Sequence, residues 1–200
     1  MNLKKLVTAA VCTMLMAAVA FTAGCGGEKK SDKKVLKVGM ECAYAPYNWS
    51  QTKADGGAVK IAGSNEYAYG YDVMMAKKLA DSMGADLEIH KIEWDGLAPA
   101  VVSGKIDAAI AGMSITSKRK ETVDFTKPYY YATVVALVKK DSEQAKAQSV
   151  ADLKGSVATS QLNTIWYDQI DQVPDVKKLP AIDTVPVSYT HLRAHETRRH

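Results

Sequence analysis

The sequence predicts an α/β fold built on a parallel sheet, because its hydrophobic periods alternate between strand and helix. Short apolar runs at 35–40, 87–92 and 106–111 suit strands, and 72–83 and 95–104 between them keep helical spacing. The order strand, helix, strand, helix, strand requires right-handed crossovers between parallel strands. The last strand is apolar almost throughout, as expected for a strand covered on both faces.

Turn and cap residues set the ends of the two helices. Asp72 is expected to cap the first helix, which Gly84 ends, and Asp95 the second, which Gly104 ends. Both aspartates are therefore interpreted as caps rather than catalytic carboxylates. No acid/base pair stands out in the sequence, and we expect no catalytic residue.

A second α/β region is expected to follow the first. Residues 132–138 form an apolar run that suits a strand crossing into this region, and 153–158 a further strand after a turn. A helix is then expected to open at 160–164 and to run to about Ile170. The sequence thus divides into a first lobe at 35–131 and the start of a second at 132–187.

Ligands of open parallel sheets gather beyond the carboxyl ends of the strands, and three segments follow such ends here. They are 41–47, 93–96 and 112–119, which supply aromatic rings, hydroxyls, the start of a further helix capped by Thr116 or Ser117, and Arg119. Arg119 is the only arginine before the last thirteen residues, and guanidinium offers paired donors that match a carboxylate. These groups suit a small zwitterion, the alternative for Arg119 being an ordinary surface position.

The N-terminus has the pattern of an export signal. A positive start with Lys4 and Lys5 precedes an apolar run at 6–21, whose 16 residues are fewer than the roughly 20 that a membrane span needs. Ala23-Gly24-Cys25 then resembles the bacterial lipobox, in which the cysteine is diacylated. We expect a lipoprotein signal peptide at 1–24, an extracytoplasmic protein anchored to the membrane through Cys25, and a flexible tether at 25–34. The alternative is a plain signal peptide with an incidental cysteine.

Charge and cysteine content exclude several classes of function. The formal net charge is +4, but positive and negative side chains balance between Cys25 and Val187, which removes the clustered basic face that nucleic-acid binding needs. Cys42 would be the one cysteine left after export and lipidation, so no intrachain disulfide is expected. No Cys/His cluster suggests a metal site, and no cofactor is expected.

Four ordered motifs carry a family resemblance. The chain resembles the polar amino-acid class of solute-binding proteins (family 3) from about Val35 to Pro186, most specifically in WDGLAPA (94–100), SGKIDA (103–108), AGMSITSKRK (111–120) and VDFTKPYY (123–130). GYDV (70–73) and APY (45–47) match with lower specificity.

The resemblance implies a periplasmic-binding-protein-like fold with two parallel-sheet α/β lobes and a cleft between them. Such a protein would be a monomer that closes on one polar, possibly basic, L-amino acid. It would deliver this ligand to the permease and ATPase subunits of an ABC importer, without chemistry.

The resemblance also implies ligand roles for seven residues. They are Arg119, Ser114 and Thr164 for the α-carboxylate, the Gly112 carbonyl for the ammonium group, Tyr44 and Trp94 as walls around the side chain, and Glu41 at its polar end.

The chain departs from the family pattern in three places. Residues 48–69 form a longer loop than usual, and Cys42 beside Glu41 is either a small pocket wall or without a role. The second lobe is expected to be incomplete, because 188–200 changes abruptly to a His- and Arg-rich composition that suggests a non-native tail. A metal-binding tail is the alternative. With half its cleft missing, the chain as written is expected to bind poorly.

Two other classes of function share this fold by resemblance. One is a dehydratase acting on cyclohexadienyl compounds such as arogenate, which needs an acid/base pair in the cleft. The other is a ligand-sensing domain that feeds a kinase. The sequence does not name the amino acid.

Overall fold

The computed structural model describes residues 33–184. Four predicted features lie outside the described residues: the signal peptide at 1–24, the lipidation site Cys25, nearly all of the tether at 25–34, and the tail at 188–200.

The central sheet is parallel, which confirms the prediction for the first lobe. Its order is β6-β1-β7, with β1 (Val35–Met40) between β6 (Asp86–Lys91) and β7 (Ala108–Ala109). Val38 in the middle of β1 pairs with Ile89 on one side and with Ala108 on the other. β7 is shorter than predicted, although the backbone N–H groups at both of its ends still donate to β1, from Asp107 to Lys37 and from Ile110 to Gly39.

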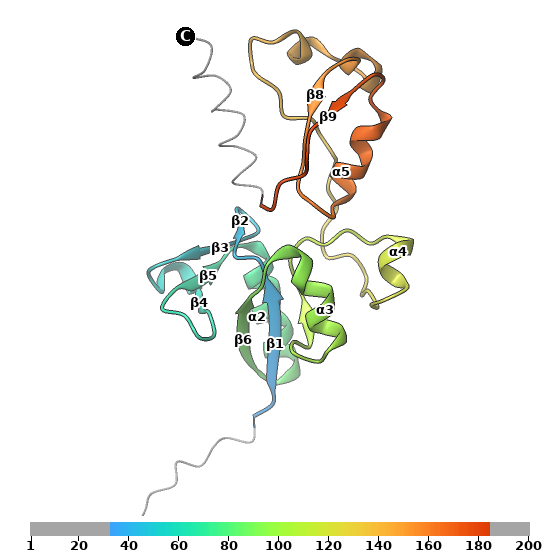
Figure 1. Cartoon of the computed structure of the whole chain (residues 1–200). Helices are drawn as coiled ribbons and strands as arrows, with labels where there is room; N and C mark the ends of the chain where they lie inside the picture. Colours follow the sequence, from blue (N-terminus) through green and yellow to red (C-terminus); the bar gives the residue numbers. More distant parts are fainter. Residues whose placement is uncertain (1–32, 185–200) are drawn as a thin grey trace, which may run out of the picture. The chain divides into compact units, whose positions relative to one another are not determined.

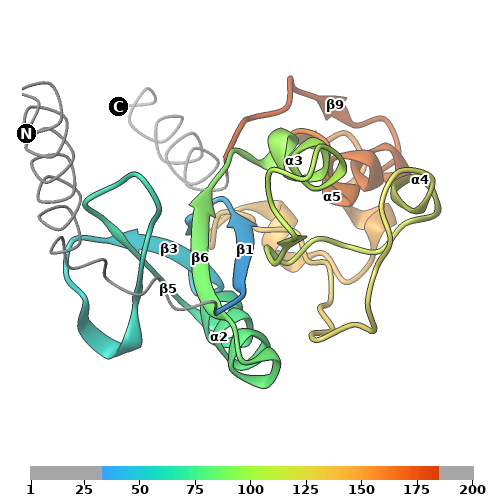
Figure 2. The same ribbon diagram turned by 90° about the horizontal axis from the view of Figure 1, so that it is seen from below.

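Two helices cover opposite faces of this sheet, as the two views in Figures 1 and 2 show. They are α2 (Tyr71–Met83) and α3 (Leu97–Val102), the latter preceded by the 3-10 turn η2 (Trp94–Gly96). Small side chains on the inner face of α2, Ala76 and Ala80, are buried and allow the helix to lie close to the strands.

The predicted helix caps were wrong at both aspartates. Gly70 is the N-cap of α2, at φ 129°, and Asp72 is a completely buried residue inside the helix. Gly96 is the N-cap of α3, whereas Asp95 belongs to η2. Both carboxylates accept hydrogen bonds from distant asparagines instead, and such long-range partners leave no local sequence signal. Gly84 does end α2, in the left-handed conformation.

Residues predicted as a long loop form a small antiparallel sheet. Its order is β2 (Ala43–Tyr44), β3 (Asn48–Gln51), β5 (Tyr67–Tyr69) and β4 (Val59–Lys60), with the 3-10 turn η1 (Asp55–Gly57) inserted. Trp49 and Tyr69 pack edge to face at 5.0 Å across two of these strands. Ile61 is 1% exposed and bridges to Ile89 of β6, so this sheet shares the core of the parallel one.

The second region consists of short elements. After α4 (Ser117–Lys120) come the 3-10 turns η3 (Glu143–Lys146) and η4 (Val150–Leu153). A two-stranded parallel sheet of β8 (Val157–Ala158) and β9 (Lys177–Lys178) follows, with α5 (Ile165–Gln169) and η5 (Ile170–Gln172) between its strands.

The predicted strand at 132–138 was wrong. No strand forms there, and its apolar side chains are exposed, Val135 by 81% and Leu137 by 62%. A strand needs a neighbour for its backbone N–H and C=O groups, and no segment within 33–184 pairs with this run. Among the same residues, no helix has the length and apolar character that a membrane crossing requires.

Candidate functional site

Five of the seven predicted ligand residues surround one small cavity of about 10 Å³. Its lining comprises Trp94, Gly112, Ser114, Arg119 and Thr164, together with Ile165 and Trp166. Trp94 lies beyond the end of β6, and Gly112 and Ser114 lie beyond β7, as the rule for open parallel sheets predicts. The other two predicted residues, Glu41 and Tyr44, do not line this cavity.

The guanidinium of Arg119 is held in place from three sides. Its Nη1 donates to the Ser114 carbonyl at 2.7 Å and its Nη2 to the Asn163 carbonyl at 2.8 Å, while the guanidinium carbon lies 5.3 Å from the centre of the Trp94 ring. Partial burial lowers the pKa of Arg119, opposed by the nearby Asp168 carboxylate, but an arginine stays charged in such a setting. A guanidinium has five N–H donors, so Arg119 keeps donors beyond the two that bind these carbonyls, and a carboxylate is the acceptor that such planar paired donors match.

Arg119 lies in α4, a helix whose N-terminus is capped. The Thr116 hydroxyl accepts a hydrogen bond from the backbone N–H of Arg119 at 3.1 Å, which confirms Thr116 as one of the two predicted caps of α4. This bond fixes the backbone from which the arginine side chain projects.

Asn163 is a site residue that the sequence did not reveal. Its carbonyl accepts from both Arg119 and the Trp94 indole N–H, the latter at 3.2 Å, and its side chain donates to Asp95 at 2.8 Å. Its backbone is left-handed at φ 55°, a conformation that asparagine tolerates better than most residues. An asparagine directly before the helix cap Thr164 was the available signal.

Thr164 is present at the site, but its hydroxyl is already bonded. It donates to the Gln161 carbonyl at 2.7 Å and accepts from the Tyr167 N–H at 3.2 Å, which makes Thr164 the N-cap of α5. A ligand that took a hydrogen bond from this hydroxyl would have to compete with the Gln161 carbonyl.

Glu41 is a buried carboxyl group at the end of β1, 6% exposed. It lines neither this cavity nor the larger one beside Tyr44. The side-chain amide of Gln161 donates to it at 2.9 Å, from a position 120 residues away that sequence reasoning missed. Burial raises the pKa of Glu41 to about 7, the Gln161 hydrogen bond opposes the shift, and the negative charges of Glu93 and Asp95 add to it. Two acidic side chains near the start of α3 therefore add negative charge close to Glu41.

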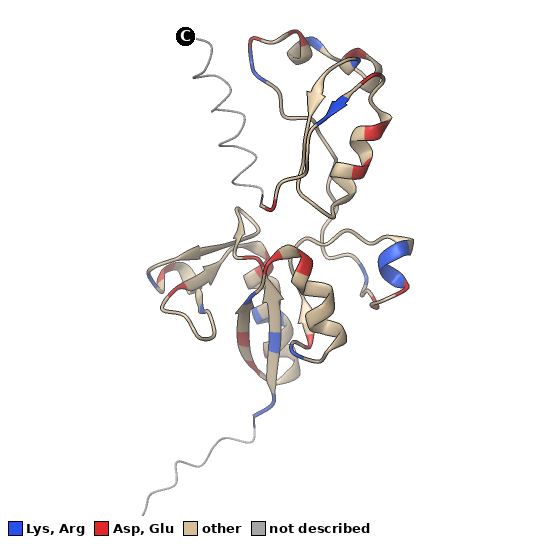
Figure 3. Cartoon of the chain, viewed as in Figure 1, with Lys and Arg blue, Asp and Glu red and all other residues tan. Residues whose placement is uncertain are grey.

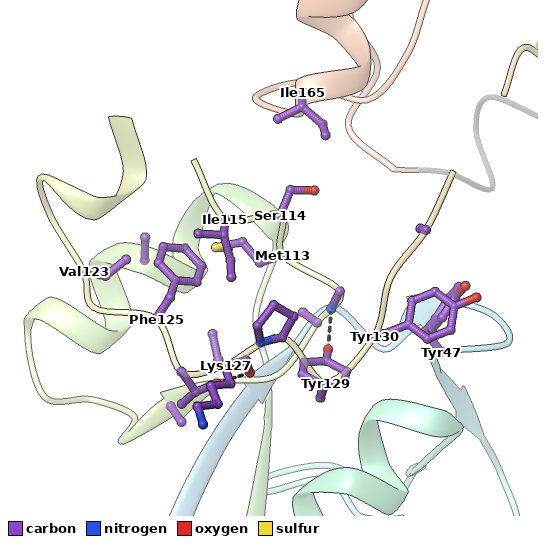
Figure 4. A pocket seen from close by; sticks show the side chains of 18 of the residues that line it. Tyr47, Met113, Ser114, Ile115, Val123, Phe125, Lys127, Tyr129, Tyr130 and Ile165 are labelled. Carbon is purple, nitrogen blue, oxygen red and sulfur yellow. Dashed lines mark hydrogen bonds between the residues drawn. The ribbon is translucent and has the colours of Figure 1, made fainter. Parts of the chain in front are cut away.

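Tyr44 stands at the edge of a larger cavity of about 480 Å³. It stacks on Tyr47 with ring centres 5.0 Å apart and approaches Trp166 at 6.2 Å. Figure 4 shows the apolar side of this cavity, where Met113, Ile115, Val123 and Phe125 gather. The two cavities share Gly112, Ser114, Ile165 and Trp166, but Tyr44 lines only the larger one and Trp94 only the smaller one.

Gly112 lines both cavities and has a left-handed backbone conformation. Its φ is +63°, and a Cβ at this position would lie 3.5 Å from the Tyr44 ring. Its N–H donates to the Tyr129 hydroxyl at 2.9 Å, the hydrogen bond drawn beside Tyr129 in Figure 4. The Tyr129 hydroxyl therefore holds the loop that carries Gly112 and Ser114.

Charged residues of both signs are interspersed along the described chain, as the colours in Figure 3 show. The helix α4 carries Lys118, Arg119 and Lys120, and η2 contains Asp95. The buried Cys42 thiol follows Glu41, and burial raises its pKa to about 12, so it is not a reactive thiolate. Within residues 33–184 no group of three His, Cys, Asp or Glu side chains could hold a metal ion.

Known proteins resemble this chain over most of its length. The ABC transporter arginine-binding protein 1 of Escherichia coli strain K12 is 32% identical over 176 residues, covering 88% of the chain and 61% of the relative. The L-cystine-binding protein TcyJ of the same strain is 28% identical over 165 residues, 82% of the chain and 57% of the relative. The chain thus spans about half to three fifths of the length of the curated relatives that it matches.

A solved structure shares the fold. The crystal structure of an ancestral amino acid-binding protein, a precursor of cyclohexadienyl dehydratase, superposes with a TM-score of 0.67 at 30% identity, covering 82% of this chain and 67% of that one. This likeness shows a periplasmic amino-acid-binding protein fold, of which the chain spans about two thirds. The family model for bacterial extracellular solute-binding proteins, family 3, matches residues 36–192, and the chain belongs to that family.

Proposed function

We propose that this protein binds a polar L-amino acid with a cationic side chain, arginine being the leading candidate, and delivers it to an ABC permease. The observation that carries this is the Arg119 fork, held by two carbonyls and by the Trp94 ring. It would receive the α-carboxylate, and the Gly112 carbonyl the ammonium group.

The acidic surroundings of Glu41 support a cationic side chain. Glu93 and Asp95 add negative charge near this buried carboxyl, and a guanidinium or ammonium group would relieve their mutual repulsion. Binding would close the two lobes around the ligand without chemistry, because contacts to both lobes form only in the closed state.

Isothermal titration calorimetry on the full-length gene product tests the proposal. L-Arginine and L-lysine are expected to bind more tightly than L-glutamine and L-cystine, and D-arginine to bind weakly. Arg119→Ala is expected to remove binding, whereas Lys118→Ala, an exposed cation on the same helix, leaves it unchanged. Absence of binding for all five ligands would contradict the proposal.

Anchoring through Cys25 is proposed with it, on the lipobox pattern at the end of the signal sequence. Labelling with a palmitate analogue in a bacterial host tests this. Cys25→Ser is expected to abolish both the label and membrane fractionation, whereas Cys12→Ser, inside the apolar run, retains them. A label that survives Cys25→Ser would reject lipidation at this residue.

A dehydratase is the second candidate function, favoured by the solved neighbour and by one carboxyl group. The pKa of Glu41, raised to about 7, suits a group that exchanges a proton near neutral pH. Release of phenylalanine from arogenate, or of phenylpyruvate from prephenate, followed by chromatography, would establish this activity. Loss of that release in Glu41→Gln would assign the proton transfer.

A further inference from the structure

Asp72 is a completely buried carboxylate at the centre of a four-bond network within the first lobe. Its Oδ2 accepts from the Asn48 side-chain amide at 2.7 Å, and its Oδ1 accepts from the Tyr129 hydroxyl at 2.8 Å. Asn48 accepts in turn from the backbone N–H of Cys42 at 2.9 Å, and Tyr129 from the backbone N–H of Gly112 at 2.9 Å. Each oxygen of one carboxylate therefore controls one backbone N–H through a single intervening side chain.

The two N–H groups at the ends of this network share an unusual backbone conformation. Cys42 has φ +55° and Gly112 has φ +63°, so both are left-handed, and Cys42 lacks the freedom of a glycine. Further hydrogen bonds hold Cys42, whose carbonyl accepts from the N–H and the hydroxyl of Ser50 at 2.9 and 3.1 Å. A left-handed residue persists only when its surroundings fix it, and the Asp72 network does so at both turns.

These two turns lie next to residues that are proposed to bind the ligand. Cys42 lies between Glu41, which follows β1, and Tyr44 of β2. Gly112 follows β7 and precedes Ser114, whose carbonyl accepts a hydrogen bond from Arg119. The turns belong to separate loops, and the network is a connection between them that passes through α2.

Burying the Asp72 carboxylate in the core has an unfavourable desolvation free energy. Desolvation raises the pKa of Asp72, and the hydrogen bonds from Tyr129 and Asn48 oppose that shift. An apolar side chain of similar volume would avoid the cost of desolvation. The carboxylate, however, accepts the hydrogen bonds that orient the turns at Cys42 and Gly112.

We infer that Asp72 is a positioning residue for amino-acid binding, which acts through Asn48 and Tyr129 to hold the Cys42 and Gly112 turns in register. The inference rests on the proposed function only for the identity of the ligand.

The network has two arms, one from Asp72 through Asn48 to Cys42 and one from Asp72 through Tyr129 to Gly112. Three single variants test these arms separately. In the ligand-free protein, amide hydrogen exchange read by NMR is expected to accelerate at Gly112 in Tyr129→Phe and at Cys42 in Asn48→Ala. In Asp72→Asn it is expected to accelerate at both. Tyr71→Phe is the matched control: the Tyr71 ring stacks on Tyr129, and its hydroxyl donates to the Tyr129 backbone carbonyl at 3.2 Å, so the variant removes a contact to Tyr129 but leaves the Tyr129 hydroxyl and its two hydrogen bonds in place.

Calorimetry with L-arginine gives the binding readout. Tyr129→Phe is expected to raise the Kd by about tenfold, the size of effect that follows from one lost hydrogen bond near a charged site, and Tyr71→Phe to leave it unchanged. A Tyr129→Phe protein with a lower unfolding temperature but the wild-type Kd would reduce the network to a structural role and overturn the inference.

The two proposals fail separately. If the wild-type protein binds none of the amino acids, the proposed function fails, while the exchange pattern still tests the network. If exchange at Gly112 and Cys42 is the same in all variants, the inference fails whatever the ligand. Should Asp72→Asn not fold, the opposite patterns expected of Tyr129→Phe and Asn48→Ala decide between the outcomes.

Discussion

Arg119 has a role that depends on the shape of its side chain as well as on its charge. Its two Nη groups donate to carbonyls of Ser114 and Asn163, from different segments of the chain, while its face lies on Trp94. An ammonium group is a point charge without a planar face and cannot reproduce this arrangement.

Arg119→Lys is therefore expected to weaken L-arginine binding by about tenfold or more, although the charge is kept. Calorimetry measures the change, with Lys118→Arg on the same helix as the control for an altered basic side chain. Wild-type affinity in Arg119→Lys would mean that charge alone suffices at this position.

Glu41 makes the stability of the ligand-free protein depend on pH. Its folded-state pKa is raised from 4.5 to about 7, so between these values the folded protein binds more protons than the unfolded chain. Stability is then greatest at low pH within this window and falls as pH rises through about 7, by on the order of 3 kcal/mol at most. Thermal unfolding followed by circular dichroism at several pH values measures the fall.

Glu41→Gln is the test variant for this effect. It is expected to remove the decrease in stability between about pH 5 and pH 8, while Glu93→Gln, at an exposed neighbouring position, removes only a small part of it. A wild-type protein whose stability rises over this range would contradict the raised pKa.

Residues of the site differ in how far sequence could predict them. Trp94, Gly112 and Arg119 follow strand ends or open a capped helix, and these are local signals. Gln161 and Asn163 act through partners 120 and 44 residues away; the place of Asn163 before the helix cap Thr164 is a local signal for a turn, but it does not indicate the distant partner.

Elements whose side chains are buried against one core were predictable, and those defined by pairing were less so. β1, β6 and α2 have strong periods because one face or both faces of each are buried. The sheet at 48–69 consists of strands of two to four residues, too short for a period, and depends on cross-strand pairs such as Trp49 with Tyr69. The run at 132–138 has the composition of a strand, but composition does not supply a pairing partner.

The start of α2 depends on Gly70. Its φ is +129°, and a Cβ there would lie 2.3 Å from the Tyr47 carbonyl oxygen, a backbone atom that cannot move aside alone. Gly84 at the other end of α2 is also left-handed, at φ +63°, but a Cβ there meets nothing within 4 Å. A side chain at Gly70 would therefore meet both a steric clash and an unfavourable φ, whereas one at Gly84 would meet only the unfavourable φ.

Gly70→Ala is expected to destabilise the fold by about 3 kcal/mol or more, and Gly84→Ala by only about 1 kcal/mol, the usual cost of a left-handed alanine. Urea denaturation of both variants measures the difference in the free energy of unfolding. Equal losses would show that the Tyr47 segment moves away at little cost.

At the scale of the whole molecule, the second region has little core of its own. Within 33–184 the buried hydrophobic residues come from the first lobe, between Leu36 and Ala111, whereas Gln161 and Thr164 are the buried residues of the second. Sequence could predict that an α/β region follows the first lobe, since 153–170 has the right signals. It could not predict how much of that region packs, because packing depends on all the strands of a sheet together.

Ligand binding is therefore expected to stabilise this protein through contacts that join the two regions. Arg119 and Trp94 of the first region already donate to the Asn163 carbonyl of the second, and a bound zwitterion would add contacts to the same groups. A ligand that binds only the folded state stabilises it by about 2.7 kcal/mol at a concentration of 100 times its Kd. L-Arginine is thus expected to raise the unfolding temperature in a dose-dependent way, whereas D-arginine at equal concentration controls for ionic effects. In Arg119→Ala the shift is expected to vanish. If both enantiomers produced the same shift, the stabilisation would come from general ionic effects, and the contacts at Arg119 and Trp94 would have no part in it.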